Sequence, residues 1–194
     1  MVTSSDPTHF LLTTDPTVPG NVSVTVQLTQ NNPYVPPVYV QGQNFAGSTT
    51  INGTITASAP NYASGIGIPV LYPTGIGFVS LPLSASASSS AIRLGPTVVI
   101  LNPATLAYYN LPTNGLNPQA APLLVSISSS NSSVGTIVNA PAIIPVGQTT
   151  PTNNNFPSFQ PAGDGSTSIS ITQPAGYFSP TGYYTDQLPA NITN

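Results

Sequence analysis

Residues 21–30, NVSVTVQLTQ, alternate strictly between apolar and polar positions. Val22, Val24, Val26 and Leu28 fall on one face, and Ser, Thr, Gln and Asn side chains fall on the other. Because successive side chains of a β-strand point to opposite faces, this period predicts a strand with one apolar face. Pro-rich stretches precede and follow the strand and separate it from its neighbours along the chain. Its partner must therefore lie elsewhere, in its own sheet or in another molecule.

The remaining chain shows short apolar runs separated by turn residues. We expect strands at 38–42, 49–57, 65–72, 75–83, 96–101, 122–128, 135–139, 142–147 and 167–172. Each run is rich in Val, Ile, Thr or aromatic residues and is bounded by Pro, Gly, Asn or Ser. No stretch has a sustained helical period, and 105–111 is expected to form a helical turn at most. This pattern predicts an all-β fold, an antiparallel immunoglobulin-like or jelly-roll β-sandwich.

The Pro-rich stretch after the first strand suggests two parts. Residues 1–37 are predicted to form an N-terminal donor-strand arm, which carries the strand 21–30 and a stiff connector, NNPYVPP. Residues 38–194 are predicted to form the β-sandwich head. A second apolar stretch in the arm, THFLLTT at 8–14, is another candidate for the same role.

The charge content is unusually low and excludes several classes of function. The 194 residues include one Lys or Arg and four Asp or Glu, so 3% are charged, against about 25% in ordinary domains. One cation cannot neutralise several phosphates, which excludes sequence-independent nucleic-acid binding and a basic membrane-surface patch. No apolar run approaches the roughly 18 residues of a membrane span, so no membrane insertion is expected.

Residues able to carry catalysis are scarce. The chain has no Cys, and His9 is its single His. The acids are Asp6, Asp15, Asp164 and Asp186, and they are scattered along the sequence. This leaves few groups for general acid–base chemistry or for a metal site, so we expect no catalytic residues, no metal and no cofactor.

Four Asn-X-Ser/Thr sequons occur, at Asn21, Asn52, Asn131 and Asn191. The Ser, Thr and Asn content by itself yields about this many, so only their placement is informative. Asn52 lies in the turn-like INGT and Asn131 in the Ser-rich SSSNSS, both of which should face solvent. These four positions are the candidate sites for N-linked glycans.

The scarcity of charge also favours an extracellular structural role. Stability depends on pH only through groups whose proton affinity changes on folding, and this chain has few of them. Arg93 leaves a trypsin-like protease one specific site. A surface of hydroxyls and amides suits a protein exposed to acid and proteases.

Two hypotheses follow for the strand at 21–30. It could simply belong to its own sheet. It could instead complete the sheet of the next subunit, with main-chain hydrogen bonds and Val22, Val24, Val26 and Leu28 filling apolar pockets. Repeated head to tail, this second contact does not close on itself and produces a homopolymeric filament.

An N-terminal alternating strand, a Pro-bearing connector and a Ser/Thr/Asn-rich, all-β remainder resemble the donor-strand pilins of archaeal threads. Those subunits come from thermoacidophilic archaea and are similar in fold to bacterial type I pilins. The resemblance implies a glycosylated cell-surface filament, serving adhesion or biofilm formation, in which each N-terminal strand completes its neighbour. It assigns the groove-filling role to the four apolar residues of 21–30 and glycans to the sequons.

Two other classes of function remain open. A jelly-roll capsid, turret or fibre protein of a virus would share the low charge. A carbohydrate-binding β-sandwich would use the Tyr residues, with Tyr177, Tyr183 and Tyr184 of GYFSPTGYY as an aromatic platform for sugars.

Overall fold

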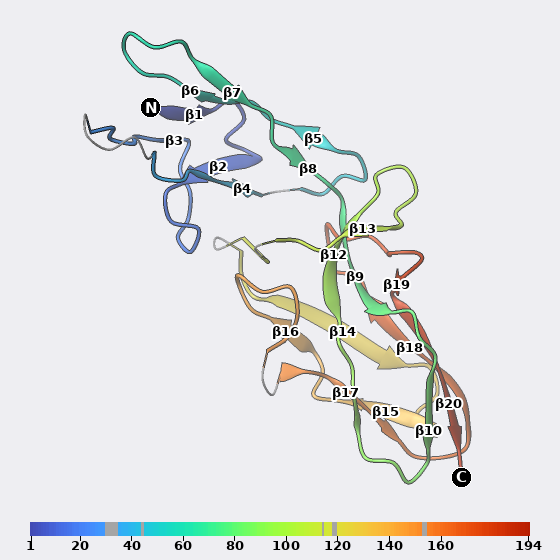
Figure 1. The fold of residues 1–194 in the computed structure, drawn as a ribbon. Helices are drawn as coiled ribbons and strands as arrows, with labels where there is room; N and C mark the ends of the chain where they lie inside the picture. The colour runs from blue at the N-terminus through green and yellow to red at the C-terminus, as the bar shows by residue number, and fades with distance from the viewer. Residues whose placement is uncertain (30–34, 44, 114, 118–119, 153–154) are drawn as a thin grey trace.

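The computed structural model describes residues 1–29, 35–43, 45–113, 115–117, 120–152 and 155–194. No α-helix occurs among these residues, and nearly all strand pairings are antiparallel, so the predicted all-β class is confirmed. The strands form two groups that share no sheet (Figure 1). We call residues 1–71 the N-terminal lobe and residues 74–194 the C-terminal lobe.

The N-terminal lobe is built from short strands. They are β1 (Val2–Ser4), β2 (Phe10–Thr13), β3 (Ser23–Val24), β4 (Tyr39–Gly42), β5 (Ile51–Asn52), β6 (Ile55–Ala57), β7 (Gly65–Gly67) and β8 (Val70–Leu71). A four-stranded sheet has the order β3-β1-β6-β7, and β2-β4 and β5-β8 form two-stranded ladders. The buried apolar side chains come mainly from β2, where Phe10 is 1% and Leu12 0% exposed.

The C-terminal lobe has longer strands and three sheets. Its strands are β9 (Thr74–Val79), β10 (Leu83–Ser86), β11 (Ile92–Arg93), β12 (Thr97–Leu101), β13 (Tyr108–Asn110), β14 (Leu123–Ser129), β15 (Gly135–Val138), β16 (Ala142–Ile144), β17 (Ser158–Pro161), β18 (Gly165–Thr172), β19 (Tyr184–Thr185) and β20 (Gln187–Thr193). The sheet orders are β10-β20-β18-β14-β16, β11-β17-β15 and β13-β12-β9-β19. The β10–β20 pair is parallel.

One apolar core joins the sheets of the C-terminal lobe. Alternate residues of β20, namely Leu188, Ala190 and Ile192, are buried, and β18 contributes Ile169 and Ile171 in the same way. Residues of β9, β12, β14, β16 and β17 complete this cluster. Sheets that bury one face against each other in this manner form a β-sandwich.

The predicted strand at 21–30 is shorter in the structure. Only Ser23–Val24 forms β3, which pairs with β1 through Val2 to Val24 and Thr3 to Ser23. The alternation did not set the extent of the ladder, because a backbone forms a strand only where a partner strand lies alongside it. Residue 30, and residues 31–34 of the predicted connector, lie outside the described residues.

Strands of the predicted arm, residues 1–37, pair with strands that follow it in the sequence. Strand β1 pairs with β6, and β2 pairs with β4, so both strands find partners beyond residue 37. The division into an arm and a head at residue 37 stays a prediction. The second donor candidate, 8–14, contains β2, whose four residues are all buried within the lobe.

Two further stretches differ in detail from the expected elements. Within 105–111, Tyr108–Asn110 form strand β13, which follows a turn that the hydrogen bond from Leu106 N to Asn102 O closes at 2.8 Å. The predicted strands at 49–57 and 65–72 are each interrupted, which produces β5 with β6 and β7 with β8. The strands predicted at 122–128 and 167–172 correspond closely to β14 and β18.

Candidate functional site

The four apolar residues predicted to fill a groove lie on an open part of the N-terminal lobe. Val22 is 50% and Leu28 58% exposed, and Val24 and Val26 are half-buried. We call Val22, Val24, Val26 and Leu28 the apolar row. The row is held to its own lobe by the two residue pairs of the β1–β3 ladder, by the hydrogen bond from Ser4 N to Val22 O at 2.9 Å and by the hydrogen bonds between Asn21 and Leu12. Within the described chain, the two ends of the row are therefore exposed and its middle is half-buried.

All four sequon Asn residues are exposed. Asn131 accepts hydrogen bonds at Oδ1 from the backbone N and the Oγ of Ser133, at 3.1 and 2.7 Å. Asn191 accepts one from Ser166 Oγ at 2.6 Å. Exposure is a requirement for a glycan, so the structure leaves each position accessible to one.

The titratable groups do not gather into a catalytic cluster. His9 Nδ1 lies 2.7 Å from Asp6 Oδ2, and this hydrogen bond holds the pKa of Asp6 below its usual value. Hydrogen bonds from Thr17 lower the pKa of Asp15 in the same way. Across the described residues, no group of three or more His, Cys, Asp or Glu side chains could hold a metal ion.

Arg93 and Asp164 have local roles. Arg93 is exposed on β11, and its guanidinium lies 3.3 Å from the centre of the Phe156 ring, which is a cation–π contact. Asp164 lies in the bend before β18 and accepts a hydrogen bond from Asn194 Nδ2 at 2.7 Å. Both arrangements stabilise the surface and bring together no reactive groups.

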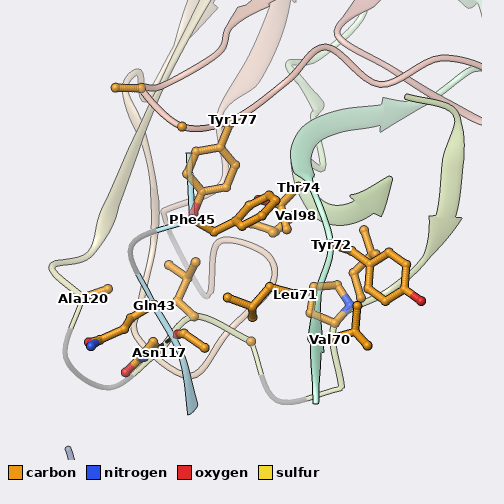
Figure 2. Close-up of a pocket in the computed structure, with 17 residues that line it drawn as sticks. Gln43, Phe45, Val70, Leu71, Tyr72, Thr74, Val98, Asn117, Ala120 and Tyr177 are labelled. Carbon is orange, nitrogen blue, oxygen red and sulfur yellow. Dashed lines mark hydrogen bonds between the residues drawn. The ribbon is translucent and has the colours of Figure 1, made fainter. Parts of the chain in front are cut away.

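A cleft of about 390 Å³ lies between the two lobes (Figure 2). Gln43, Phe45 and Leu71 line it from the N-terminal lobe, and Val98, Asn117 and Tyr177 are among the residues that line it from the C-terminal lobe. None of the described lining residues carries a charge.

The N-terminal wall of the cleft follows directly after β4. The backbone N of Gln43 donates to His9 O at 3.0 Å, and its side-chain Nε2 donates to Pro7 O at 3.0 Å. Asn117 Nδ2 reaches across from the other lobe and donates to Gly42 O at 2.6 Å. These bonds fix the position of the wall and connect the lobes at one end of the cleft.

Tyr177 forms part of the opposite wall because the chain after β18 is fastened to β9. Gln173 accepts a hydrogen bond from Ile76 N at 3.0 Å and donates to Ile76 O at 2.6 Å. Further along, the backbone N of Phe178 donates to Thr74 O at 2.8 Å. The segment between these anchors carries Tyr177, and burial raises the pKa of its hydroxyl.

The aromatic platform suggested by the sequence is divided in the structure. Tyr177 packs against the main core beside the cleft, whereas Tyr184 belongs to a smaller cluster with Val99 and Leu101. Tyr183 and Tyr184 instead surround Tyr108, with ring centres 5.8 and 5.0 Å from it. The three Tyr residues therefore do not form one binding surface.

Sequence reasoning missed most of the cleft. Gln43, Phe45 and Asn117 lie in irregular segments that follow no period, and they come together only because the two lobes meet. The sequence indicates Tyr177 through its aromatic neighbours along the chain, which do not predict its place in the cleft.

No described segment forms a helix long and apolar enough to cross a membrane.

No protein-family model and no curated protein matches this chain. Among solved structures, the chain is similar to the crystal structure of the S-layer protein SbsC domains 4 and 5, with a TM-score of 0.38 and 14% sequence identity. The aligned region covers 75% of this chain and 65% of that one, so the chain spans slightly less than two thirds of that structure's length.

Proposed function

We propose that this protein is a structural subunit of an extracellular surface assembly. More specifically, it builds a filament in which copies join head to tail and the apolar row of one copy completes a sheet of the next. The observation that carries this proposal is the exposure of the row, with Val22 at 50% and Leu28 at 58%. An apolar row whose two ends stay exposed in its own chain offers a surface that another molecule can bury.

The weak attachment of this segment supports an exchange between copies. Two residue pairs join β3 to β1, and residues 25–28 have no ladder partner in the described chain. A short ladder is easily replaced by a longer one, and an unpaired backbone gains hydrogen bonds when it adds to a sheet. Donor-strand complementation of the kind used by thread pilins would supply such a ladder.

The electrostatics also favour self-association. With one Lys or Arg and four Asp or Glu, the formal net charge is −3, and the copies repel one another little. Edge strands of monomeric proteins are usually protected by charged side chains, which block pairing with other molecules. Residues 16–92 contain no charged side chain, so this protection is absent from β3 to β10.

The same proposal assigns N-linked glycans to Asn52, Asn131 and Asn191, which are exposed and lie outside the sheet that contains β3. Asn21 precedes Val22 directly, so a glycan there would lie beside the proposed contact. We therefore expect Asn21 to be unmodified in assembled material and the other three sites to carry the added mass, which intact mass and peptide mapping would measure.

Electron microscopy of purified protein tests the filament directly. We expect thin fibres from the natural sequence and none from Leu28→Asp, because burying a carboxylate among apolar groups opposes association. The matched control is Leu124→Asp, since Leu124 on β14 is also 58% exposed. The Leu28 variant should lose on the order of 100-fold in association affinity, equal to about 2.7 kcal/mol.

Three results would contradict the proposal. They are fibres that persist in Leu28→Asp, equal loss in both variants, and compact monomers from the natural sequence at high concentration. Closed shells would instead favour the capsid hypothesis.

A further inference from the structure

We infer that the cleft between the lobes is a binding site for a neutral saccharide unit. Its volume of about 390 Å³ falls within the range of ~300–1,000 Å³ found for small-molecule sites. The site is separate from the apolar row, so the inference does not depend on filament formation.

The chemistry of the lining selects the class of ligand. Phe45, Tyr72 and Tyr177 provide aromatic surface, and Leu71 and Val98 provide aliphatic surface. Sugars present an apolar face of C–H groups, which packs on such surfaces, and a rim of hydroxyl groups. A cleft that is mostly apolar with a few polar side chains matches both parts of a sugar.

The polar side chains of the cleft suit hydroxyl partners. The amide nitrogens of Gln43 and Asn117 already donate to Pro7 O and Gly42 O, and each side chain also carries an amide oxygen of the acceptor type that a sugar hydroxyl needs. The Tyr177 hydroxyl can both donate and accept. Figure 2 shows Gln43 and Asn117 together at one end of the cleft, Tyr177 at the other, and Leu71 and Phe45 between them. A ring placed between these ends would meet polar groups on two sides.

The absence of charge from the described lining excludes ionic ligands. A phosphate or carboxylate transferred into this cleft would lose its hydration and find no cation to compensate. Arg93 lies on β11 beside Phe156 and does not line the cleft. We therefore expect neutral sugars to bind and a charged sugar acid of similar size to be rejected.

The walls of the cleft are already held in place, which lowers the cost of binding. Hydrogen bonds within the chain hold these walls, namely from Gln43 to Pro7, from Asn117 to Gly42 and between Gln173 and Ile76. Preorganised groups lose less conformational entropy when a ligand arrives. Because the two walls belong to different lobes, a bound sugar would also stabilise their arrangement.

Saturation-transfer NMR is the direct test, with glucose, mannose, galactose and N-acetylglucosamine as neutral probes and glucuronate as the charged comparator. We expect saturation to be transferred from the protein protons to the C–H protons of at least one neutral sugar. We expect no saturation transfer to glucuronate. Tyr177→Ala should weaken binding about tenfold, the effect of ~1.4 kcal/mol, through loss of the aromatic face. Tyr177→Phe keeps the ring and should bind within about threefold of the natural protein.

A second variant guards against misfolding of Tyr177→Ala. Ala120 lines the cleft and is exposed, so Ala120→Trp would fill the opening without removing a core contact. It should abolish transfer, whereas Tyr62→Ala, at a 76% exposed Tyr of the N-terminal lobe that does not line the cleft, should leave transfer unchanged. Absence of transfer to every neutral sugar, equal transfer to glucuronate, or unchanged transfer in Ala120→Trp would each overturn the inference.

Discussion

The sequence Gly-Ile-Gly occurs once in each lobe, and its two copies have opposite environments. In the N-terminal lobe it forms β7, at the end of the sheet, where Ile66 is 69% exposed. In the C-terminal lobe it lies in β9, between β12 and β19, where Ile76 is 0% exposed. The same three residues are thus an open edge in one lobe and part of the core in the other.

The glycines of the two copies show the same contrast. A Cβ added at Gly75 would overlap the Phe178 carbonyl oxygen, and one at Gly77 would lie 2.9 Å from Pro180 Cγ. A Cβ at Gly65 or Gly67 would meet nothing within 4 Å. In β9 the missing side chains allow residues 178–180 to pack closely against the strand, whereas in β7 they leave open space.

This difference teaches that the two lobes reach stability in different ways. The C-terminal lobe buries its apolar residues within the chain, in one large cluster and a smaller one. The N-terminal lobe is shorter, yet it holds most of the large apolar side chains that stay exposed, including Val22, Leu28, Ile66 and Ile68. We interpret the C-terminal lobe as complete in one copy. Under the proposed function, the N-terminal lobe is completed by a neighbouring copy.

The largest expected effect distinguishes the two isoleucines. Ile76→Ala should lower the free energy of unfolding by about 2–5 kcal/mol, because it opens a cavity in a packed core. Ile66→Ala should change it by less than about 0.5 kcal/mol in dispersed protein. Chemical denaturation of both variants measures the difference, and equal losses would remove the basis of the comparison.

A smaller effect is expected at the glycines. Gly75→Ala should cost about 1–3 kcal/mol, because the new methyl group would force the Phe178 backbone away. Gly65→Ala should be neutral, or stabilising by about 0.5 kcal/mol through the lower entropy of the unfolded chain. The melting temperatures of the two variants measure this difference. A lower melting temperature for Gly65→Ala than for the natural protein would show that the β7 edge is packed.

The smallest effect concerns pH and should be confined to the N-terminal lobe. Hydrogen bonds lower the pKa of Asp6 and of Asp15 below their usual value of 3.8. A depressed folded-state pKa contributes stability above the unfolded pKa, and this contribution is lost as pH falls below about 4. Asp6→Asn should reduce the loss of stability that β1 and β2 undergo in acid. Hydrogen exchange of the β1 and β2 amides at pH 5 and at pH 3 measures this loss. Equal acid sensitivity with and without Asp6 would contradict this assignment.

Short runs rich in Val, Ile and Thr, bounded by turn residues, allowed β14 and β18 of the C-terminal core to be predicted from sequence. Strands β14 and β18 bury every second residue and were expected within two residues of their ends. Strand β20 was missed, because Pro189 interrupts a run in which Leu188, Ala190 and Ile192 still face the core. Tertiary packing, rather than local propensity, decides that this segment is a strand.

The cleft and the extent of β3 were not predictable from sequence, for a related reason. Alternation in 21–30 specifies which side chains share a face but not how many backbone groups find partners. The walls of the cleft come from segments about 60 to 135 positions apart, such as those of Gln43, Asn117 and Tyr177. These residues come together only because the two lobes are in contact. No local sequence pattern predicts that contact.

Hydrogen exchange on dispersed and assembled protein tests the central claim most directly. We predict that the amides of residues 25–28, which have no ladder partner in the described chain, exchange rapidly in the dispersed protein and become protected on assembly, while β18 and β20 are equally protected in both states. Assembly that leaves 25–28 unprotected would contradict the view that a neighbouring copy completes the N-terminal lobe.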